Sequence, residues 1–207
     1  MSDRVALITG STRGIGLGIA RALAADGYTL ALNGVRPADQ VQPVLDEFRD
    51  KGVEAAYFRA DISRADDRRA LMHGVIEHFG RLDVLVNNAG YAPLASIDRT
   101  TPDLLDRAFR VNALGPANLI AAAWPVLCRS GNACIINIST LGTRDPFPGF
   151  FAYASAKGAV NVMARSCAKE GKAHGVKAFA IAPGAVETPM LRANFSTTQI
   201  PPSRALP

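Results

Sequence analysis

The segment Val5-Ala6-Leu7-Ile8-Thr9-Gly10-Ser11-Thr12-Arg13-Gly14-Ile15-Gly16 sets the architecture of this chain. Its first five residues are an apolar run without polar alternation, typical of a strand buried on both faces of a parallel sheet. The glycine-rich residues follow, and apolar residues then recur at helical spacing up to Ala25. This order predicts a dinucleotide site, because glycine lets backbone N–H groups approach a pyrophosphate at the positive end of a helix. A tight turn without a ligand would show the same pattern.

The rest of the chain continues this alternation of strand and helix. Further strands are predicted at 28–33, 53–59, 82–86, 133–138 and 176–182, and helices at 17–25, 41–51, 66–79, 101–112, 118–127 and 153–171, with a short helix near 188–191. Residues 194–207 carry no predicted regular structure. The alternation predicts an α/β fold of the Rossmann type, a doubly wound parallel sheet flanked by helices on both faces. Without a linker or repeat, residues 1–207 are expected to form a single domain.

The residues after the second predicted strand bear on the choice of cofactor. In NAD-binding folds, a carboxylate about 20 positions beyond the glycines binds the ribose 2′-hydroxyl. This chain has Asn33-Gly34-Val35-Arg36 there, and its next carboxylate is Asp39. Arg36 and Arg13 could flank a 2′-phosphate with bidentate, charge-assisted bonds, which favours NADP(H) over NAD(H). The alternative is that Arg36 faces solvent.

Tyr153 and Lys157 stand four residues apart near the start of a long predicted helix. Residues at this spacing share one helical face. A lysine ammonium beside a phenol stabilises phenolate and lowers the tyrosine pKa, so that the pair could exchange a proton with a carbonyl or alcohol. By itself, a pair at this spacing is more often a solvated helix face.

Composition excludes several other classes of function. Hydrophobic content of 48% and charged content of 20% suit a soluble globular protein. The net charge of +5 brings no basic stripe with aromatic residues, so no nucleic-acid partner is expected. Three cysteines without metal-ligand spacing predict reduced thiols and no metal site. No signal peptide or apolar run of membrane-spanning length is visible, so we expect a cytoplasmic protein without a membrane partner.

Taken together, these motifs resemble the short-chain dehydrogenase/reductase family, and most closely its 3-oxoacyl-acyl-carrier-protein reductase-like branch. In the family's order and spacing, the chain contains Thr9-Gly10-x-x-x-Gly14-x-Gly16, Asn87-Asn88-Ala89-Gly90, Asn112, the Ser139 region, Tyr153-x-x-x-Lys157, and Pro183-Gly184 with Thr188. The resemblance implies an NAD(P)-dependent oxidoreductase that acts on CH–OH donors and reduces a ketone or other carbonyl to an alcohol by hydride transfer. The branch says little about the substrate.

The resemblance also implies a role for each matching catalytic residue. Tyr153 would be the general acid, and Lys157 would lower its pKa and bind the nicotinamide ribose. Ser139 would hydrogen-bond the substrate carbonyl, and Asn112 would hold a water in a proton relay behind Lys157. The family's common spacing to the tyrosine falls on Thr140, whereas the local pattern around Ser139 fits better. We therefore assign the hydroxyl donor to Ser139, with Thr140 as the alternative.

The implied cofactor-binding set extends along the whole chain. It comprises Gly10, Thr12, Arg13, Gly14, Ile15, Gly16, Arg36, Asp61, Ile62, Asn88, Ala89, Gly90, Tyr153, Lys157, Pro183, Gly184 and Thr188. By the resemblance, Asn88 and Gly90 line the adenine-ribose side, residues 61–62 contact the adenine, and residues 183, 184 and 188 lie along the nicotinamide.

One departure from the family concerns the C-terminus. Family members continue past Pro207 with another helix and a final edge strand, and without these the sixth strand would be an exposed edge. We expect a homodimer through the two long helices that contain Asn112 and Tyr153, with a tetramer as the alternative. The competing interpretation is a non-catalytic dinucleotide-binding protein that has lost its substrate pocket.

The loop before the Tyr153 helix and the residue after Gly90 supply candidates for the walls of a substrate pocket. Five residues could line an apolar pocket, although core packing explains each of them equally well: Tyr91, Leu141, Phe147, Phe150 and Phe151. Arg144 and Asp145, in the same loop, could face a polar substrate group or water.

Overall fold

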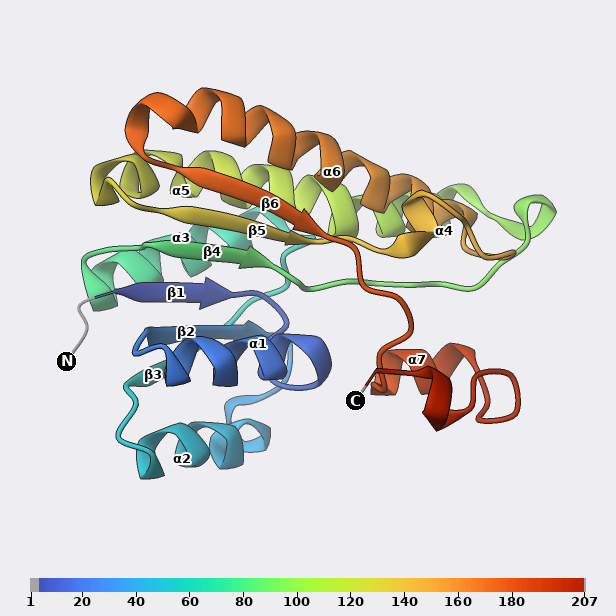
Figure 1. Cartoon of the computed structure of the whole chain (residues 1–207), viewed down its shortest axis with the longest axis horizontal. Coiled ribbons are helices and arrows are strands. Elements are labelled where there is room, and N and C mark those ends of the chain that lie inside the picture. Colours follow the sequence, from blue (N-terminus) through green and yellow to red (C-terminus); the bar gives the residue numbers. More distant parts are fainter. Residues whose placement is uncertain (1–3, 207) are drawn as a thin grey trace.

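The computed structural model describes residues 4–206, in which a parallel sheet of six strands forms the centre (Figure 1). The strands are β1 (Val5–Ile8), β2 (Thr29–Gly34), β3 (Ala55–Arg59), β4 (Val84–Asn87), β5 (Cys134–Ile138) and β6 (Lys177–Ile181). Their order is β3-β2-β1-β4-β5-β6, and every pairing is parallel. This confirms the predicted Rossmann-type sheet, whose strand order changes direction between β1 and β4.

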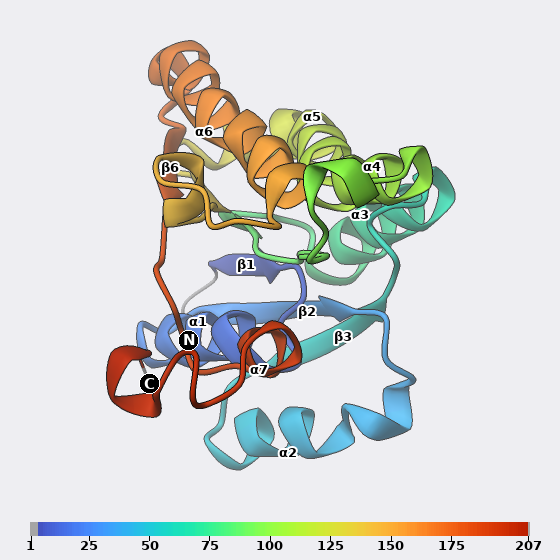
Figure 2. The same ribbon diagram turned by 90° about the vertical axis from the view of Figure 1, so that its right-hand side faces the viewer.

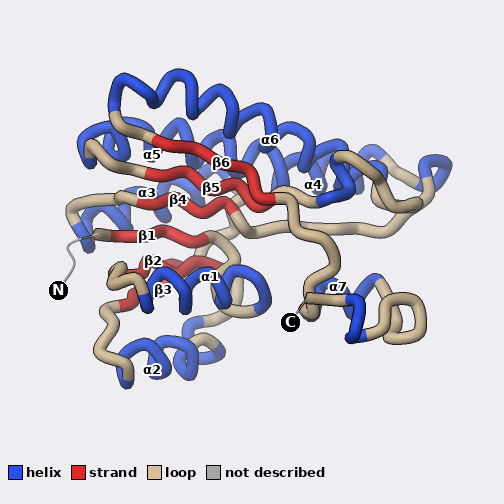
Figure 3. The backbone as a smooth tube through the Cα atoms, viewed as in Figure 1, coloured by secondary structure: helices blue, strands red, loops and turns tan. Residues whose placement is uncertain are grey.

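Helices cover both faces of the sheet, as Figures 1 and 3 show. The helices are α1 (Gly14–Ala25), α2 (Gln42–Asp50), α3 (Ala65–Phe79), α4 (Pro102–Phe109), α5 (Gly115–Ser130), α6 (Phe151–Gly171) and α7 (Pro189–Asn194), with single 3₁₀ turns at Ala38–Gln40, Ile97–Arg99, Leu141–Thr143, Lys172–His174 and Pro202–Arg204. Helices α1 and α2 lie on one face, and α3, α5 and α6 lie on the other. Helix α7 lies beyond the carboxyl ends of the strands, next to α1 (Figure 2).

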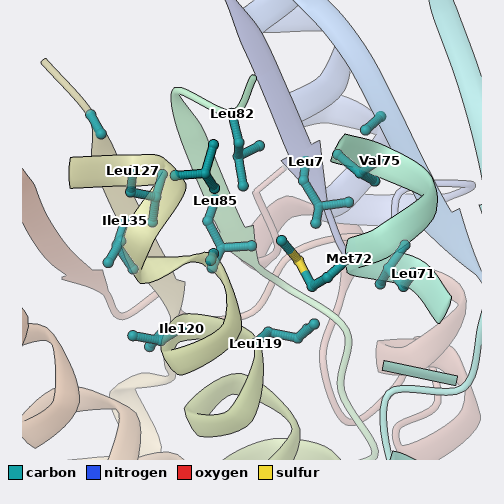
Figure 4. Close-up of a cluster of buried hydrophobic side chains, with 14 of the residues drawn as sticks. Leu7, Leu71, Met72, Val75, Leu82, Leu85, Leu119, Ile120, Leu127 and Ile135 are labelled. Atoms are coloured by element: carbon teal, nitrogen blue, oxygen red, sulfur yellow. The ribbon is translucent and has the colours of Figure 1, made fainter. Parts of the chain in front are cut away.

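Two buried apolar clusters attach these helices to the sheet. Between the sheet and the α3–α5 layer, the larger cluster includes Leu7, Leu71, Leu85, Leu119 and Ile135 (Figure 4). Ile8, the next residue in β1, belongs to the cluster on the α1 face. Successive residues of β1 therefore enter opposite clusters, which explains why this strand is an unbroken apolar run.

The two helices expected at 101–112 and 118–127 form one continuous helix from Pro102 to Ser130, with a π turn at Arg110–Leu114. Pro116 supplies no N–H for an ordinary helical bond to residue 112, so the regular pattern is interrupted there. By length and composition this helix could cross a membrane, which corrects the expectation that no apolar run reaches that length. Half of its most apolar window is buried in the protein, as in the core helix of a globular fold.

Strand β6 forms one edge of the described sheet, as expected for the sixth strand. Phe179 and Ile181, on the face opposite α6, are 54% and 50% exposed. Residues after 194, for which no regular structure was predicted, contain a 3₁₀ turn and a bridge between Val186 and Leu206.

Candidate active site

A cavity of about 790 Å³ opens at the carboxyl ends of the strands. Its walls come from the glycine-rich turn after β1, the ends of β2, β4 and β5, the first turns of α6, and the α7 segment. In open parallel sheets this edge, at the change of strand direction, is where ligands bind. Of the predicted site residues, Asn112 alone does not line the cavity.

Gly10, Gly14 and Gly16 leave a concave backbone surface at the turn, called the cradle below, which larger side chains would fill. Gly10 and Gly14 have φ values of +64° and +55°, a region that favours glycine. A Cβ on Gly16 would lie 2.3 Å from the Gly10 carbonyl oxygen, so α1 begins directly against the turn. Within residues 4–206, no side chain caps α1 at its N-cap, Arg13. Its first N–H groups therefore remain available for an anion.

The segment after β4 is fastened to the glycine-rich turn through Thr9. The Thr9 hydroxyl accepts hydrogen bonds from the backbone N–H groups of Asn88 and Ala89, both at 3.0 Å. The Asn88 side-chain amide donates to the carbonyls of Thr9 and Gly10 at 2.9 and 3.1 Å. Asn88 therefore stabilises the cavity wall through its own contacts with the turn. The sequence analysis assigned no role to Thr9, because its function depends on a strand 75 or more residues away in the chain.

The end of β2 brings Arg36, and no carboxylate of its own, to the cavity, where Arg13 of the glycine-rich turn also lies. Asn33 is buried, and its side-chain amide donates to the carbonyls of Phe58 and Ala60, which closes the β2–β3 end. Gly34 follows without a side chain, and Arg36 and Arg13 both line the cavity. The Tyr57 hydroxyl donates to the Arg36 carbonyl at 2.8 Å and so holds this backbone in place.

Tyr153 and Lys157 project into the cavity from the first turns of α6, where Lys157 is buried and Tyr153 is partly buried. The Lys157 side chain is 3% exposed, and its Nζ donates to the Ile138 carbonyl at 2.7 Å. A Cβ on Gly90 would lie 3.8 Å from this Nζ, so the glycine keeps space open beside the ammonium. Three distant segments thus converge here: the end of β5, the start of α6 and the loop after β4.

Burial controls the protonation of both groups. It raises the pKa of Tyr153 to about 12, while hydrogen bonding with the Thr140 side chain acts in the opposite direction. It also lowers the pKa of Lys157 to about 8, because a buried ammonium loses its hydration. The structure thus corrects the expectation of a lowered tyrosine pKa: loss of solvent dominates, and the Lys157 ammonium is engaged with a carbonyl.

The two candidate hydroxyls after β5 differ in their surroundings. Ser139 lines the cavity but is only 2% exposed, and its Oγ donates to the Lys157 carbonyl at 3.5 Å. Thr140 is half-buried and accepts a hydrogen bond from the Gly142 N–H at 3.2 Å. Its side chain also hydrogen-bonds with that of Tyr153. The geometry therefore favours Thr140 over Ser139 as the hydroxyl next to the tyrosine.

Asn112 lies fully buried in the π turn. Its side-chain amide donates to the carbonyls of Tyr91 and Ala108 at 2.7 and 2.9 Å, and its Oδ1 accepts from the Tyr91 N–H at 3.1 Å. The side-chain amide is thus engaged by the backbone. It fixes the loop after β4 against the helix.

Four of the five apolar residues predicted as possible pocket walls do line the cavity. Tyr91, Leu141, Phe147 and Phe150 line the cavity, and Phe151 does not. Asp145 also lines it, whereas Arg144 does not. Phe195 lines the cavity as well and was missed, because it lies in the segment for which no regular structure was predicted. No spacing rule connects it with the loop before α6.

The described residues offer no metal centre, since no three His, Cys, Asp or Glu side chains between positions 4 and 206 gather as ligands. Cys128, Cys134 and Cys167 are free thiols, and burial raises the pKa of Cys134 and Cys167.

Comparison with known proteins gives consistent matches along the chain. Residues 4–199 match the family described as short chain dehydrogenase. The chain is 38% identical to ketoacyl reductase 2 of the granaticin polyketide synthase of Streptomyces violaceoruber, covering 89% of this chain and 74% of that protein. It is 34% identical to the 3-oxoacyl-acyl-carrier-protein reductase FabG of Staphylococcus aureus, covering 96% and 83%. A crystal structure of a gluconate 5-dehydrogenase from Burkholderia cenocepacia with NADP and tartrate is 34% identical, with a TM-score of 0.86 and coverage of 93% and 75%.

Proposed function

The chain belongs to the short-chain dehydrogenase family, and from that membership we propose that it is an NADPH-dependent reductase of ketones. The similar ketoacyl reductases support carbonyl reduction as the reaction. The observation that carries the proposal is the convergence of Tyr153, Lys157 and Thr140 with the glycine-rich turn on one cavity. We assign both the cofactor and the catalytic residues to one domain.

The cavity walls fit a dinucleotide. The uncapped start of α1 and the cradle of Gly10, Gly14 and Gly16 suit a pyrophosphate. Arg13 and Arg36 suit a 2′-phosphate, and Gly34 leaves no carboxylate at the end of β2 to repel it. The NADP in the similar gluconate 5-dehydrogenase structure supports this choice. The remaining contacts are assigned to the other predicted positions that line the cavity: Thr12, Ile15, Asp61, Ile62, Asn88, Ala89, Gly90, Pro183, Gly184 and Thr188.

The catalytic residues have the protonation states that reduction requires. When bound, the cofactor supplies the hydride for the carbonyl carbon. Because its pKa is about 12, Tyr153 is protonated at neutral pH and donates its proton to the carbonyl oxygen. Lys157 carries its charge below about pH 8 and would bind the nicotinamide ribose of the cofactor. Thr140 donates a second hydrogen bond to the same oxygen as its charge develops.

The competing function is dinucleotide binding without catalysis. Structural demands alone do not explain a lysine ammonium that is 3% exposed, since burying it is costly for folding. A cavity that extends past Tyr153 to Phe147 and Phe195 also leaves room for a second ligand.

A single substitution distinguishes the two functions. Tyr153→Phe should lower kcat for NADPH-dependent ketone reduction by at least about 100-fold and leave NADPH affinity within about twofold. Tyr28→Phe, which removes a hydroxyl that accepts from Arg4 outside the cavity, is the matched control. Equal turnover by Tyr153→Phe and the native chain would refute the assignment. If neither protein reduces any ketone but both bind NADPH, the binding function is correct.

Cofactor preference is measured by fluorescence titration with NADPH and NADH. Arg36→Ala should weaken NADPH binding about 10- to 100-fold, because a charge-assisted bond is lost, and should leave NADH binding unchanged. Arg165→Ala removes the same charge from an exposed position of α6 outside the cavity and serves as the control. Tighter NADH binding by the native chain would overturn the preference.

A further inference from the structure

Three aromatic rings that line the cavity lie against one another: we call Phe147, Phe150 and Phe195 the aromatic shelf. The Phe195 ring lies 5.0 Å from Phe147 and 5.7 Å from Phe150, measured between ring centroids. The Phe150 ring lies 5.6 Å from that of Tyr153. The shelf therefore leads directly to the ring that carries the proton-donating hydroxyl.

The shelf rings differ in exposure. Phe195 is 7% exposed and supports the other two from the α7 side, whereas Phe147 is 54% exposed. Hydrogen bonds hold the supporting segment in place: the Asn194 side chain donates to the Ala92 carbonyl at 3.2 Å, and Thr188 caps α7 through the Leu191 N–H. The exposed Phe147 ring, which packs against the buried Phe195 ring, thus lines the cavity near Tyr153.

Along the chain, the charged cavity residue nearest to the shelf is a carboxylate, Asp145. The charged residues lining the cavity are Arg13, Arg36, Asp61, Arg107, Asp145 and Lys157. Asp145 is an exposed carboxylate two residues before Phe147. Arg107 stacks on the Tyr91 ring at 4.4 Å, and Lys157 is bound to a carbonyl. A substrate lying along the shelf would therefore meet aromatic rings and a carboxylate.

We propose that the substrates of this reductase are neutral ketones whose carbonyl is attached to a planar aromatic body, which packs on the aromatic shelf. The proposal rests on the proposed function. Aromatic pairs in edge-to-face or offset geometry gain affinity beyond the burial of their area, corresponding to about two- to tenfold per pair. A carboxylate on the same body would be repelled by Asp145.

The test uses NADPH and three ketones that share one acyl group: acetophenone, cyclohexyl methyl ketone and 4-acetylbenzoate. Phe147→Leu should lower the ratio of kcat/KM for acetophenone over cyclohexyl methyl ketone about three- to tenfold. Phe179→Leu is the matched control, because Phe179 has the same 54% exposure but lies on β6, outside the cavity, and should leave the ratio unchanged. An unchanged ratio in Phe147→Leu would overturn the proposal.

Charge selection is tested at Asp145. Asp145→Asn should raise kcat/KM for 4-acetylbenzoate relative to acetophenone by about threefold or more, without altering the ratio between the two neutral ketones. Equal discrimination against the carboxylate in Asp145→Asn and the native chain would overturn the assignment of Asp145.

A binding measurement separates the shelf from the reaction. Tyr153→Phe protein with NADPH is examined by ligand-observed NMR, with and without the Phe147→Leu substitution. Tighter binding of acetophenone than of cyclohexyl methyl ketone, with the difference removed by Phe147→Leu, would support the shelf as an aromatic binding site. This result would hold even if the native chain showed no turnover. If all ketones are reduced without preference, the proposed function stands and the shelf proposal fails.

Discussion

Lys157 combines a buried ammonium with a position in the catalytic cavity. Its pKa in the folded chain is about 8, whereas that of an unfolded lysine is near 10.5. Between these pH values the unfolded chain binds more protons, so stability rises with pH; below about pH 8 the full cost of burying the charge is present. This cost is on the order of 3 kcal/mol, partly offset by the hydrogen bond to Ile138.

Lys157→Met should therefore be more stable than the native chain at pH 7, by on the order of 2 kcal/mol in the free energy of unfolding, and the difference should shrink towards pH 10. Urea unfolding at both pH values measures it. Lys172→Met, at an exposed position, should change stability by no more than about 0.5 kcal/mol at either pH. A difference for Lys157→Met that does not depend on pH would show that burial of the charge is not its cause.

The hydroxyls of Ser139 and Thr140 are distinguished by activity. Thr140→Val keeps the shape of the side chain but removes the donor, and kcat for ketone reduction should fall about 100-fold. Ser139→Ala removes a buried group whose hydrogen bond is 3.5 Å long, so kcat should change less than about fivefold. The opposite order of the two losses would return the role to Ser139.

At the scale of secondary structure, two of the glycines in α1, Gly16 and Gly18, have opposite requirements. A Cβ on Gly16 would lie 2.3 Å from the Gly10 carbonyl oxygen and 2.5 Å from the Asn88 amide nitrogen. A Cβ on Gly18 would meet nothing within 4 Å. The first glycine is required by the close approach of helix and turn, while the second only costs the helix stability.

Gly16→Ala should accordingly destabilise the chain by about 1–3 kcal/mol and weaken NADPH binding at least about tenfold, because the turn must move. Gly18→Ala should stabilise the chain by up to about 1 kcal/mol with NADPH affinity unchanged. Thermal unfolding and NADPH titration of both variants provide the comparison. Tight NADPH binding by Gly16→Ala would show that the cradle is not the pyrophosphate site.

At the scale of the whole molecule, two of the surfaces formed by residues 4–206 are candidate sites of association. One is the outer side of α6, where Val162 is 52% exposed. The other is the edge strand β6, where Phe179 and Ile181 are exposed. We propose a homodimer through the long helices, since pairing along an open strand edge is prone to aggregation.

Light scattering separates these modes of association. Val162→Glu should convert the dimer to a monomer, because it places charge in an apolar contact. Ile181→Lys should leave the dimer intact and suppress any further association along β6. A dimer that survives Val162→Glu but is lost in Ile181→Lys would place the contact on the edge strand instead.

Features that depend on neighbouring residues were predictable from the sequence. The unbroken apolar run of β1, the glycine-rich turn and the start of α6 follow from residue spacing, and the parallel sheet follows from the alternation of strands and helices. The spacing of Tyr153 and Lys157 likewise identified the pair, since helical periodicity brings both to one face.

Other features depended on residues that are far apart in the chain. The raised pKa of Tyr153 arises from burial, and burial is a property of the assembled structure. The choice between Ser139 and Thr140 depends on which hydroxyl the end of β5 turns towards Tyr153. The sequence did not decide it, because spacing to the tyrosine pointed to Thr140 and the local pattern pointed to Ser139. The contact of Phe195 with Phe147 and Phe150 joins a C-terminal segment to the loop before α6, and only packing of the α7 segment across the sheet end brings them together.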